Sequence, residues 1–296
     1  MVIAFDDNIK SDIDGYEKLL SGCHNALNSK DNEVVFDFGF VYFVEANLCA
    51  VIGAIIEILE YKNKKVSIIN VLPKVESILR RNGFLTRYGR EPLFNFHDTV
   101  IQYERFNPNK SSDDERFNVY IREQLLKKTD FPTHTNGVGK RITENIFELY
   151  ENARTHGKCN IIHTCGQYFP NKIAKPLHVT IVDRGINFRE NVSTYLKTEM
   201  QAHKAIEWAM QLGNTTKQGN TPGGLGLDVI FQFIKHNNGK IQIISSNGFW
   251  EWQNKKTISQ DLEYSFEGTI ATIRFNLNDN NSYFMTNEVT ELKNIF

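Results

Sequence analysis

Three polar motifs follow one another in the second half of the chain, and their order restricts the fold more than any other feature. The first lies on a predicted helix, where Glu148 and Asn152 are one turn apart on the same face. The second is the apolar strand 176–183, which ends in an acidic turn with glycine. The third is the glycine-rich turn 221–227, which leads into a helical pattern. Helix, strand, turn and helix in this order predict a sheet with helices packed on it.

The pair Glu148 and Asn152 has the chemistry of a catalytic or ion-binding site. A carboxylate next to a carboxamide can accept a proton and hold a hydrated divalent cation, because Mg²⁺ prefers oxygen ligands and keeps several waters. Many helices carry such a pair, so the pair alone does not predict a site. The two motifs that follow it are what make the pattern specific.

The three motifs together resemble the ATP-binding fold of the superfamily of gyrase, Hsp90, histidine kinases and MutL (GHKL), called the Bergerat fold. The form Glu-x-x-x-Asn-Ala-x-x-His-Gly over residues 148–157 is most similar to the anti-sigma-factor serine kinases. The resemblance covers residues 118–278. It implies an α+β protein whose C-terminal domain, residues 118–296, is a two-layer sandwich of a mixed sheet with helices on one face.

The resemblance also implies roles for the first motif. Glu148 would be the general base that orients or deprotonates the attacking water or serine hydroxyl. Asn152 would coordinate Mg²⁺ and bridge it to the triphosphate of ATP. His156 could contact phosphate, or it could end the helix beside Gly157, where a cation faces the negative end of the helix dipole.

The strand-end turn resembles the part of the family site that holds adenine. Asp183 would accept a hydrogen bond from the exocyclic amine, which favours adenine over guanine, and Gly185 would let the backbone approach the base. Asn187 stands where many relatives have a second glycine, and asparagine tolerates left-handed conformations. Thr269 resembles a family hydroxyl that touches adenine. An ordinary strand-end turn and an ordinary strand threonine remain the alternatives for Asp183 and Thr269.

The glycine-rich turn would bind phosphate through main-chain amides, next to the positive end of the following helix. The resemblance implies contacts from Gly223, Gly224, Leu225, Gly226 and Leu227. The stretch 188–220, with a helix around 200–212, corresponds to the family's ATP lid. Lys217 in that stretch could contact the γ-phosphate or could belong to a surface loop.

The N-terminal part reads as a separate α/β unit. A strand over 34–44, a helix over 48–59, a strand over 66–72 and a helix over 73–81 capped by Gly83 are predicted. This order resembles a STAS domain, the fold of the anti-sigma-factor antagonists. The stretch 45–48, Glu-Ala-Asn-Leu, has no hydroxyl where that family carries its phosphorylated serine. The predicted division is a STAS-like domain at 1–105, a linker at 106–117 and the ATP-binding domain after it.

Composition excludes several classes of protein. A hydrophobic content of 41% and a charged content of 23% are typical of soluble globular chains, and a net charge of −1 gives no general attraction to nucleic acid or anionic membranes. Four cysteines without metal or disulfide spacing indicate a reduced compartment. The apolar stretch 46–59 is too short to span a bilayer, and acidic residues near the start disfavour export. We therefore expect a cytoplasmic protein.

Two further patterns give structural expectations. Asn247-Gly248 between two apolar runs predicts a hairpin turn. Trp250 and Trp252 share one strand face, which predicts sheet packing rather than stacking on nucleic-acid bases, since no basic patch accompanies them.

Two functions follow from the resemblance. The first is a Mg-ATP-dependent protein kinase acting on a regulatory partner, such as a STAS-domain or sigma-factor-like protein. The second is a nucleotide-gated interaction module that binds or slowly hydrolyses ATP without phosphorylating a protein. A sensor histidine kinase is disfavoured, because no transmembrane segment or phosphoacceptor histidine helix is recognisable. Many relatives dimerise, so a homodimer is possible.

Overall fold

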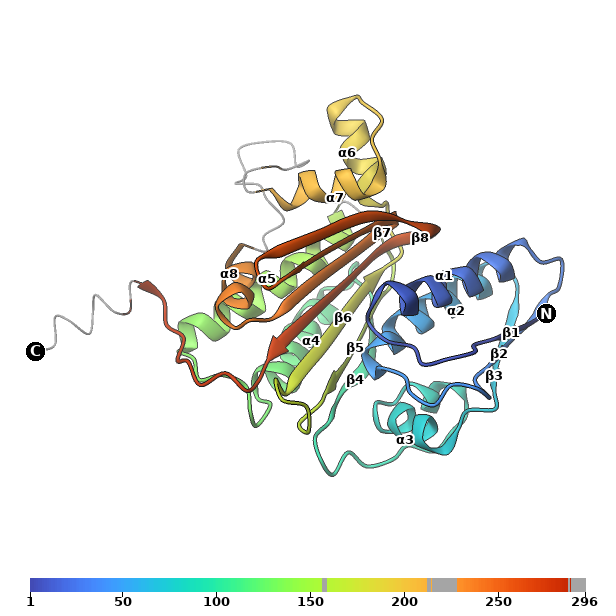
Figure 1. The fold of residues 1–296 in the computed structure, drawn as a ribbon, viewed down its shortest axis with the longest axis horizontal. Helices are drawn as coiled ribbons and strands as arrows, with labels where there is room; N and C mark the ends of the chain where they lie inside the picture. Colours follow the sequence, from blue (N-terminus) through green and yellow to red (C-terminus); the bar gives the residue numbers. More distant parts are fainter. Residues whose placement is uncertain (156–158, 212–213, 215–227, 287, 289–296) are drawn as a thin grey trace, which may run out of the picture.

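The computed structural model describes residues 1–155, 159–211, 214, 228–286 and 288. These residues form a three-stranded parallel sheet and a five-stranded antiparallel sheet, each packed with helices. Figure 1 shows the small sheet in the N-terminal part of the chain and the large sheet in the C-terminal part. The predicted α+β class is confirmed.

The N-terminal unit is built on the small sheet, in the strand order β1-β2-β3. Parallel neighbours need crossover connections, and helices α1 and α2 supply them. The elements are β1 (Val2–Ala4), α1 (Ile13–Asn28), β2 (Glu33–Asp37), the 3-10 turn η1 (Ala46–Leu48), α2 (Cys49–Tyr61), β3 (Lys65–Ile69), α3 (Pro73–Arg81) and the 3-10 turn η2 (Leu85–Tyr88).

Both helices predicted in this unit are present. α2 carries the predicted apolar stripe and is buried along most of its length. α3 begins at Pro73, whose fixed φ suits a first helical turn. Gly83 follows the end of α3 with φ +78°, a conformation that glycine adopts without strain. Local chemistry therefore sets the limits of α3 as predicted.

The strand predicted over 34–44 is shorter in the structure. β2 ends at Asp37, and the N–H of Val41 donates to the C=O of Phe38 at 3.0 Å in a turn. Phe38, Val41 and Val44 are nevertheless buried. An apolar loop that packs into the core thus produced the same sequence pattern as a strand.

The C-terminal unit is built on the large sheet, in the order β4-β5-β6-β8-β7. Its strands are β4 (Val100–Phe106), β5 (Ile162–Tyr168), β6 (Pro176–Asp183), β7 (Lys240–Gln253) and β8 (Lys256–Asn276). The pairings in this described sheet are all antiparallel. The expected mixture of strand directions was wrong, because hairpins join β5 to β6 and β7 to β8.

One face of the large sheet is covered by helices of the C-terminal unit. Their apolar side chains form one core with the sheet, which includes Trp250 and Trp252 packed near Phe231, so the prediction of sheet packing for both tryptophans is confirmed. The covering segments are α4 (Ser111–Tyr120), the π-helical segment η3 (Ile121–Leu126), α5 (Asn136–Thr155) and α8 (Asp228–His236). The helix predicted around 200–212 is α7 (Ala202–Met210), which lies with α6 (Phe188–Leu196) beside β7 (Figure 1).

The other face of the large sheet is covered by the N-terminal unit. α1 packs against β8, and α2 packs against β5 and β6. Cys165, Val182 and Ile270 of the large sheet belong to the same buried core as the small sheet. The C-terminal unit's own helices thus cover one face, as expected, and the apolar strand positions of the other face are covered by α1 and α2 of the N-terminal unit.

The segment expected to be a linker, 106–117, is ordered secondary structure at most of its positions. Phe106 ends β4, a strand of the large sheet, and α4 begins at Ser111. Phe117 is fully buried against Phe106, with ring centroids 5.3 Å apart. The chain therefore enters the large sheet before residue 106, whereas the division into two domains stays a prediction.

The hairpin turn predicted at Asn247-Gly248 lies elsewhere. Both residues are inside β7, where the pairing with β8 shifts register. The turn is Asn254-Lys255, with φ of 51° and 62°, as a two-residue type I′ loop requires. A Cβ on Gly248 would lie 2.5 Å from the backbone of Ala202. That glycine thus permits the close approach of α7 rather than a turn.

Candidate functional site

Asp183 and Thr269, both predicted at one site, face each other as a cross-strand pair of β6 and β8. Ser245 of β7 completes the group, since its Oγ donates to the C=O of Gly268 at 2.9 Å and lies 3.1 Å from Thr269 Oγ1. The same Oγ accepts the N–H of Phe188, the first residue of α6, at 2.9 Å. The ends of three strands and the start of α6 therefore meet here.

Gly268 is required for this close packing. Its φ is +118°, and a Cβ at this position would lie 2.0 Å from the C=O of Asp183. Only glycine fits such a conformation and such a contact without strain. The sequence analysis did not assign a role to Gly268 or Ser245, and the one local signal was a glycine directly before Thr269.

The turn after Asp183 is held by the aspartate itself. The N–H of Gly185 donates to Asp183 Oδ1 at 2.8 Å. Asn187 caps α6 by accepting the N–H of Glu190 at 2.9 Å, and its φ is −77°. The left-handed conformation considered for Asn187 is therefore not used, because the residue begins a helix instead.

The carboxyl of Asp183 is in an unusual electrostatic environment. Although the residue as a whole is only partly buried, desolvation raises the pKa of its carboxyl to about 7, and the hydrogen bond from Gly185 offsets this only in part. A carboxylate that is desolvated without a neighbouring cation favours a ligand that donates a hydrogen bond to it. Perturbed groups of this kind concentrate at functional sites.

Glu148 and Asn152 lie one turn apart on α5, and both are partly buried. The side-chain nitrogen of Asn152 is buried and has no hydrogen-bond partner among the residues that the structure describes. A buried amide without a partner costs free energy unless a further group satisfies it. This part of α5 therefore has unused capacity to bind a polar ligand.

Two hydrogen bonds connect the end of α5 to the turn at Asp183. The C=O of Ala153 accepts the N–H of Cys159 at 3.0 Å, and the sulfur of Cys159 accepts the N–H of Arg184 at 3.3 Å. Asn152 and Asp183 are the immediate chain neighbours of Ala153 and Arg184. The helix motif and the strand-end motif thus belong to one region.

The start of α8 lies against the same helix. Asn145, one turn before Glu148, accepts the N–H of Ile230 through its Oδ1 at 2.9 Å. Ile230 is in the first turn of α8, whose N–H groups have no partner within their own helix. This bond places the helix that follows the glycine-rich turn beside the Glu148 motif. The sequence analysis missed Asn145, although it shares a helix face with Glu148.

Several predicted site residues lie outside the described part of the chain. They are His156, Gly223, Gly224, Leu225, Gly226 and Leu227, together with Lys217 of the expected lid. The described residues of the site are therefore Glu148, Asn152, Asp183, Gly185, Asn187 and Thr269.

The part of the chain that the structure describes contains no group of three or more His, Cys, Asp or Glu side chains arranged to hold a metal ion. Magnesium sites in nucleotide-binding proteins commonly use one or two protein ligands, with waters and phosphates supplying the rest. Asn152 has the chemistry for that kind of site, because a carboxamide carries an acceptor oxygen for a cation beside the nitrogen that lacks a partner here and can donate to a phosphate.

The stretch 45–48 of the N-terminal unit is buried against the large sheet. Asn47 is fully buried, and its Nδ2 donates to Ser11 Oγ and to Thr180 Oγ1 of β6, both at 2.8 Å. Glu45 accepts the N–H of Ser11 at 2.9 Å. Desolvation alone would raise the pKa of Glu45, but its interactions with His178 and its hydrogen bonds with Ser11 together outweigh this, so the pKa falls to about 2. The stretch is a fixed polar contact between the two units.

A second cluster joins the units next to Asp183. Glu57 of α2 binds Arg105 of β4 at 2.6 Å and Arg184 at 2.9 Å. His163 Nε2 lies 3.2 Å from the same carboxylate, and its Nδ1 is 2.9 Å from the hydroxyl of Tyr103. Desolvation opposes ionisation of Glu57, yet His163 and the two arginines lower its pKa to about 2. The residue after Asp183 is thus tied to the N-terminal unit.

None of the described helices is both long enough and apolar enough to cross a membrane.

Comparison with known proteins gives a distant likeness to solved structures. No protein-family model and no curated protein matches the sequence. Among solved structures, the chain is similar to the histidine kinase domain of the blue-light activated histidine kinase from Erythrobacter litoralis EL346, with 12% sequence identity over 88% of this chain and 92% of that one. The TM-score is 0.26. A score this low says nothing about what this chain binds.

Proposed function

We propose that the chain binds Mg-ATP in the region where β6 and β8 pair and the end of α5 lies alongside. One observation carries the proposal, namely the desolvated carboxyl of Asp183 directly opposite Thr269. The exocyclic amine of adenine would donate to that carboxylate, whereas the C6 oxygen of guanine can only accept. The Thr269 hydroxyl would provide a second polar contact to the base.

The α5 motif would serve the phosphate end of the nucleotide. Asn152 would hold Mg²⁺, which neutralises charge on the phosphates when bound. Glu148 would orient the nucleophile and take its proton, since it lies one turn from Asn152 on the same rigid helix. The start of α8 points backbone N–H groups toward the same region, as anion sites at helix N-termini require.

Our leading proposal for the reaction is transfer of the γ-phosphoryl group to a hydroxyl of a regulatory protein. The hydroxyl oxygen would form the new bond to phosphorus, ADP would leave, and Glu148 would accept the hydroxyl proton. The similarity of residues 148–157 to the anti-sigma-factor serine kinases supports this choice of reaction.

The second candidate is an ATP-gated interaction module without kinase activity. The burial of Asn47 favours it, because the position that resembles a STAS phosphoacceptor lacks a hydroxyl and is locked against Thr180. The N-terminal unit therefore has no phosphoacceptor of the STAS type at that position. It would instead transmit nucleotide state to other surfaces.

Binding is tested by calorimetry of the full chain with Mg-ATP and Mg-GTP. We expect the wild type to prefer ATP, and Asp183→Asn to lose at least about tenfold in ATP affinity, because a charge-assisted hydrogen bond is lost. Asp37→Asn is the matched control, since Asp37 ends β2 and accepts the N–H of Gly39 at 2.9 Å in the same local turn. No binding of either nucleotide by the folded wild type would disprove the proposal.

The two functions are separated by following the γ-phosphate. Incubation with labelled ATP and candidate partner proteins should give phosphoserine or phosphothreonine if the chain is a kinase. Release of free phosphate without labelled protein would favour the gated module. Both activities should be lost in Glu148→Gln while ATP binding remains, because the amide keeps the shape but cannot accept the proton.

A further inference from the structure

A strongly basic segment lies in the N-terminal unit. Residues 62–90 contain eight Lys and Arg residues and a single Glu, in a chain whose net charge is −1. The basic residues are Lys62, Lys64, Lys65, Lys74, Arg80, Arg81, Arg87 and Arg90. Lys64 is buried, where its Nζ donates to two backbone carbonyls. The others surround β3, α3 and η2, which make up the segment.

β3 lies at the edge of the small sheet, and in the described residues no strand pairs with its outer side. Lys65 N–H donates to Asn32 C=O, and Ile69 C=O accepts the N–H of Phe38, so alternate residues of β3 bond inward to β2. Val66 and Ile68, the residues between them, must then direct their N–H and C=O groups outward. Such an edge can pair with another polypeptide.

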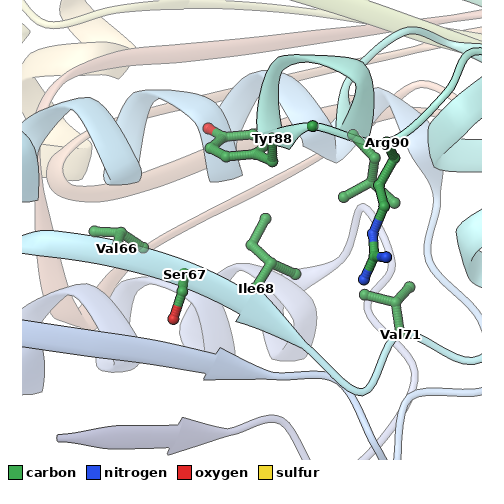
Figure 2. Close-up of a pocket in the computed structure, with 8 residues that line it drawn as sticks. Val66, Ser67, Ile68, Val71, Tyr88 and Arg90 are labelled. Atoms are coloured by element: carbon green, nitrogen blue, oxygen red, sulfur yellow. The ribbon is translucent and has the colours of Figure 1, made fainter.

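A hollow of about 360 Å³ lies beside this edge, between β3 and η2. Its lining combines the apolar side chains of Val66, Ile68, Val71, Leu85 and Tyr88 with Ser67, Gly89 and one cation, Arg90. Figure 2 shows Val66 and Ile68 pointing toward the side where Tyr88 lies, with the guanidinium of Arg90 between Ile68 and Val71. The Arg90 side chain remains 54% exposed beside Glu76. An apolar side chain fits the hollow, and an acidic one fits its rim.

We propose that the outer edge of β3 binds an extended acidic segment of a partner protein by strand addition. The partner's main chain would pair with the N–H and C=O groups of Val66 and Ile68. An apolar side chain of the partner would enter the hollow beside Leu85. Its carboxylates would face Arg90 and the other exposed cations of residues 62–90, so the charges of the two surfaces are complementary.

The same features argue against two other occupants. A second copy of this chain would bring two equally basic edges together, which like charges oppose. The phosphates of a nucleic acid would neutralise the cations. Its backbone, however, has no N–H donors at the spacing of a β-strand to pair with the outward carbonyls of β3. An acidic polypeptide satisfies the charge, the edge and the hollow together.

The test is a selection of short displayed peptides against the full chain, followed by fluorescence anisotropy with the selected peptides. We expect peptides rich in Asp and Glu with apolar residues at alternate positions, and affinity that falls as salt rises. Two versions of the bound peptide, each N-methylated at one of its two sets of alternate amides, should be compared. Only one version should lose binding, since only one set of amides faces β3. Arg90→Glu should weaken binding by about five- to tenfold.

Arg141→Glu is the matched control, because Arg141 is similarly exposed and also lies beside a glutamate, but on α5. Its affinity should equal that of the wild type. The proposal is overturned if no peptide is selected or if selected peptides are not acidic. It is equally overturned if N-methylation in both registers leaves affinity unchanged, or if single-stranded DNA displaces the peptide and binds more tightly.

Discussion

At the scale of single residues, Asp183 carries the clearest energetic cost. Its pKa of about 7 stands against a usual value of 3.8, and each pKa unit corresponds to about 1.4 kcal/mol, so the ionised carboxylate costs the fold about 4 kcal/mol. Because the pKa of Asp183 is raised in the folded state, its carboxyl does not lower the free energy of unfolding below about pH 4. It lowers that free energy progressively as pH rises toward 7. A group that destabilises the fold at neutral pH is more readily explained by binding than by structure.

The first prediction is that Asp183→Asn stabilises the protein above neutral pH. The amide keeps the acceptor for Gly185 but never ionises, and its unsatisfied NH₂ takes back part of the gain, so we expect about 2 kcal/mol at about pH 8. Near pH 5 the carboxyl is protonated in the folded state and ionised in the unfolded state, so less than half of the cost remains. The unsatisfied NH₂ of the variant offsets that remainder, and the difference should be close to zero. Urea denaturation at both pH values measures this. Asp37→Asn should show no such gain, and an Asp183→Asn variant that is less stable at high pH would contradict the assigned environment.

The second prediction concerns pH and the base itself. Adenosine is the suitable probe because it has no phosphate that titrates. If the ionised carboxyl accepts the adenine amine, affinity should rise about tenfold between roughly pH 6 and pH 8, following the ionised fraction of a group of pKa about 7. The Asp183→Asn variant should show a flat profile. A wild-type affinity that does not change with pH would show that the ionised carboxyl of Asp183 does not bind the base.

At the scale of elements, the Glu57 cluster joins α2 to β4, β5 and the turn after β6. The Glu57 pKa of about 2 lies below its usual 4.5, so the cluster stabilises the fold above about pH 4.5 by about 3 kcal/mol and loses this as pH falls toward 2. The two arginines are left without this counter-charge, and His163 without this hydrogen-bond partner, when Glu57 is removed.

The third prediction is that Glu57→Gln lowers the free energy of unfolding by about 3 kcal/mol at neutral pH, since breaking a buried ion pair leaves uncompensated charge. Chemical denaturation measures the loss. Glu33→Gln is the control, because Glu33 pairs with Lys65 on the surface, where both side chains are largely exposed and such pairs contribute little. Equal effects of the two substitutions would show that the cluster is not a structural link.

The elements that sequence predicted well are those fixed by local chemistry. Pro73 and Gly83 delimit α3, and the apolar run over 176–183 coincides with β6. The errors arise where contacts with distant parts of the chain determine the local structure. Asn247-Gly248 has the composition of a hairpin turn, but the backbone of Ala202 occupies the space beside Gly248. That Asp183 and Thr269 lie close together was expected only from the family resemblance. Spacing in the sequence does not give the register of two strands, so it could not predict that these residues pair.

The fourth prediction follows from Gly248. Substitution by alanine would place a Cβ 2.5 Å from the carbonyl carbon of Ala202 and from the N of His203, both backbone atoms that cannot rotate away. α7 must then move outward, at a cost of about 1–3 kcal/mol. Hydrogen exchange should accelerate in α7 and remain unchanged in β1. Gly89→Ala tests strain without contact, because Gly89 has φ +79° and nothing within 4 Å.

At the scale of the whole molecule, the small sheet, α1 and α2, the large sheet, and α4, α5 and α8 form successive layers (Figure 1). The boundary between the two units is partly polar. Besides Asn47 and Thr180, the hydroxyl of Tyr16 in α1 lies 2.9 Å from Thr272 Oγ1, and the same Oγ1 is 2.9 Å from that of Thr180. Hydrogen bonds in such a buried network strengthen one another, so the loss of one member is costly. We infer that the two units fold as one, which sequence could not show because the network joins residues from both ends of the chain.

The fifth prediction is that Thr180→Val destabilises both units together. Valine keeps the shape but leaves the Asn47 amide and the Thr272 hydroxyl short of a partner, at a cost of about 1–3 kcal/mol. Calorimetry should show one transition moved to lower temperature, and exchange of the slowest amides should accelerate equally in β2 and in β8. Thr257→Val is the control, since Thr257 is exposed near the hairpin turn. If exchange accelerated in β8 alone, or if two transitions separated on heating, the N-terminal unit would be an independent domain docked on the large sheet, because a network that joins both units cannot be weakened on one side only.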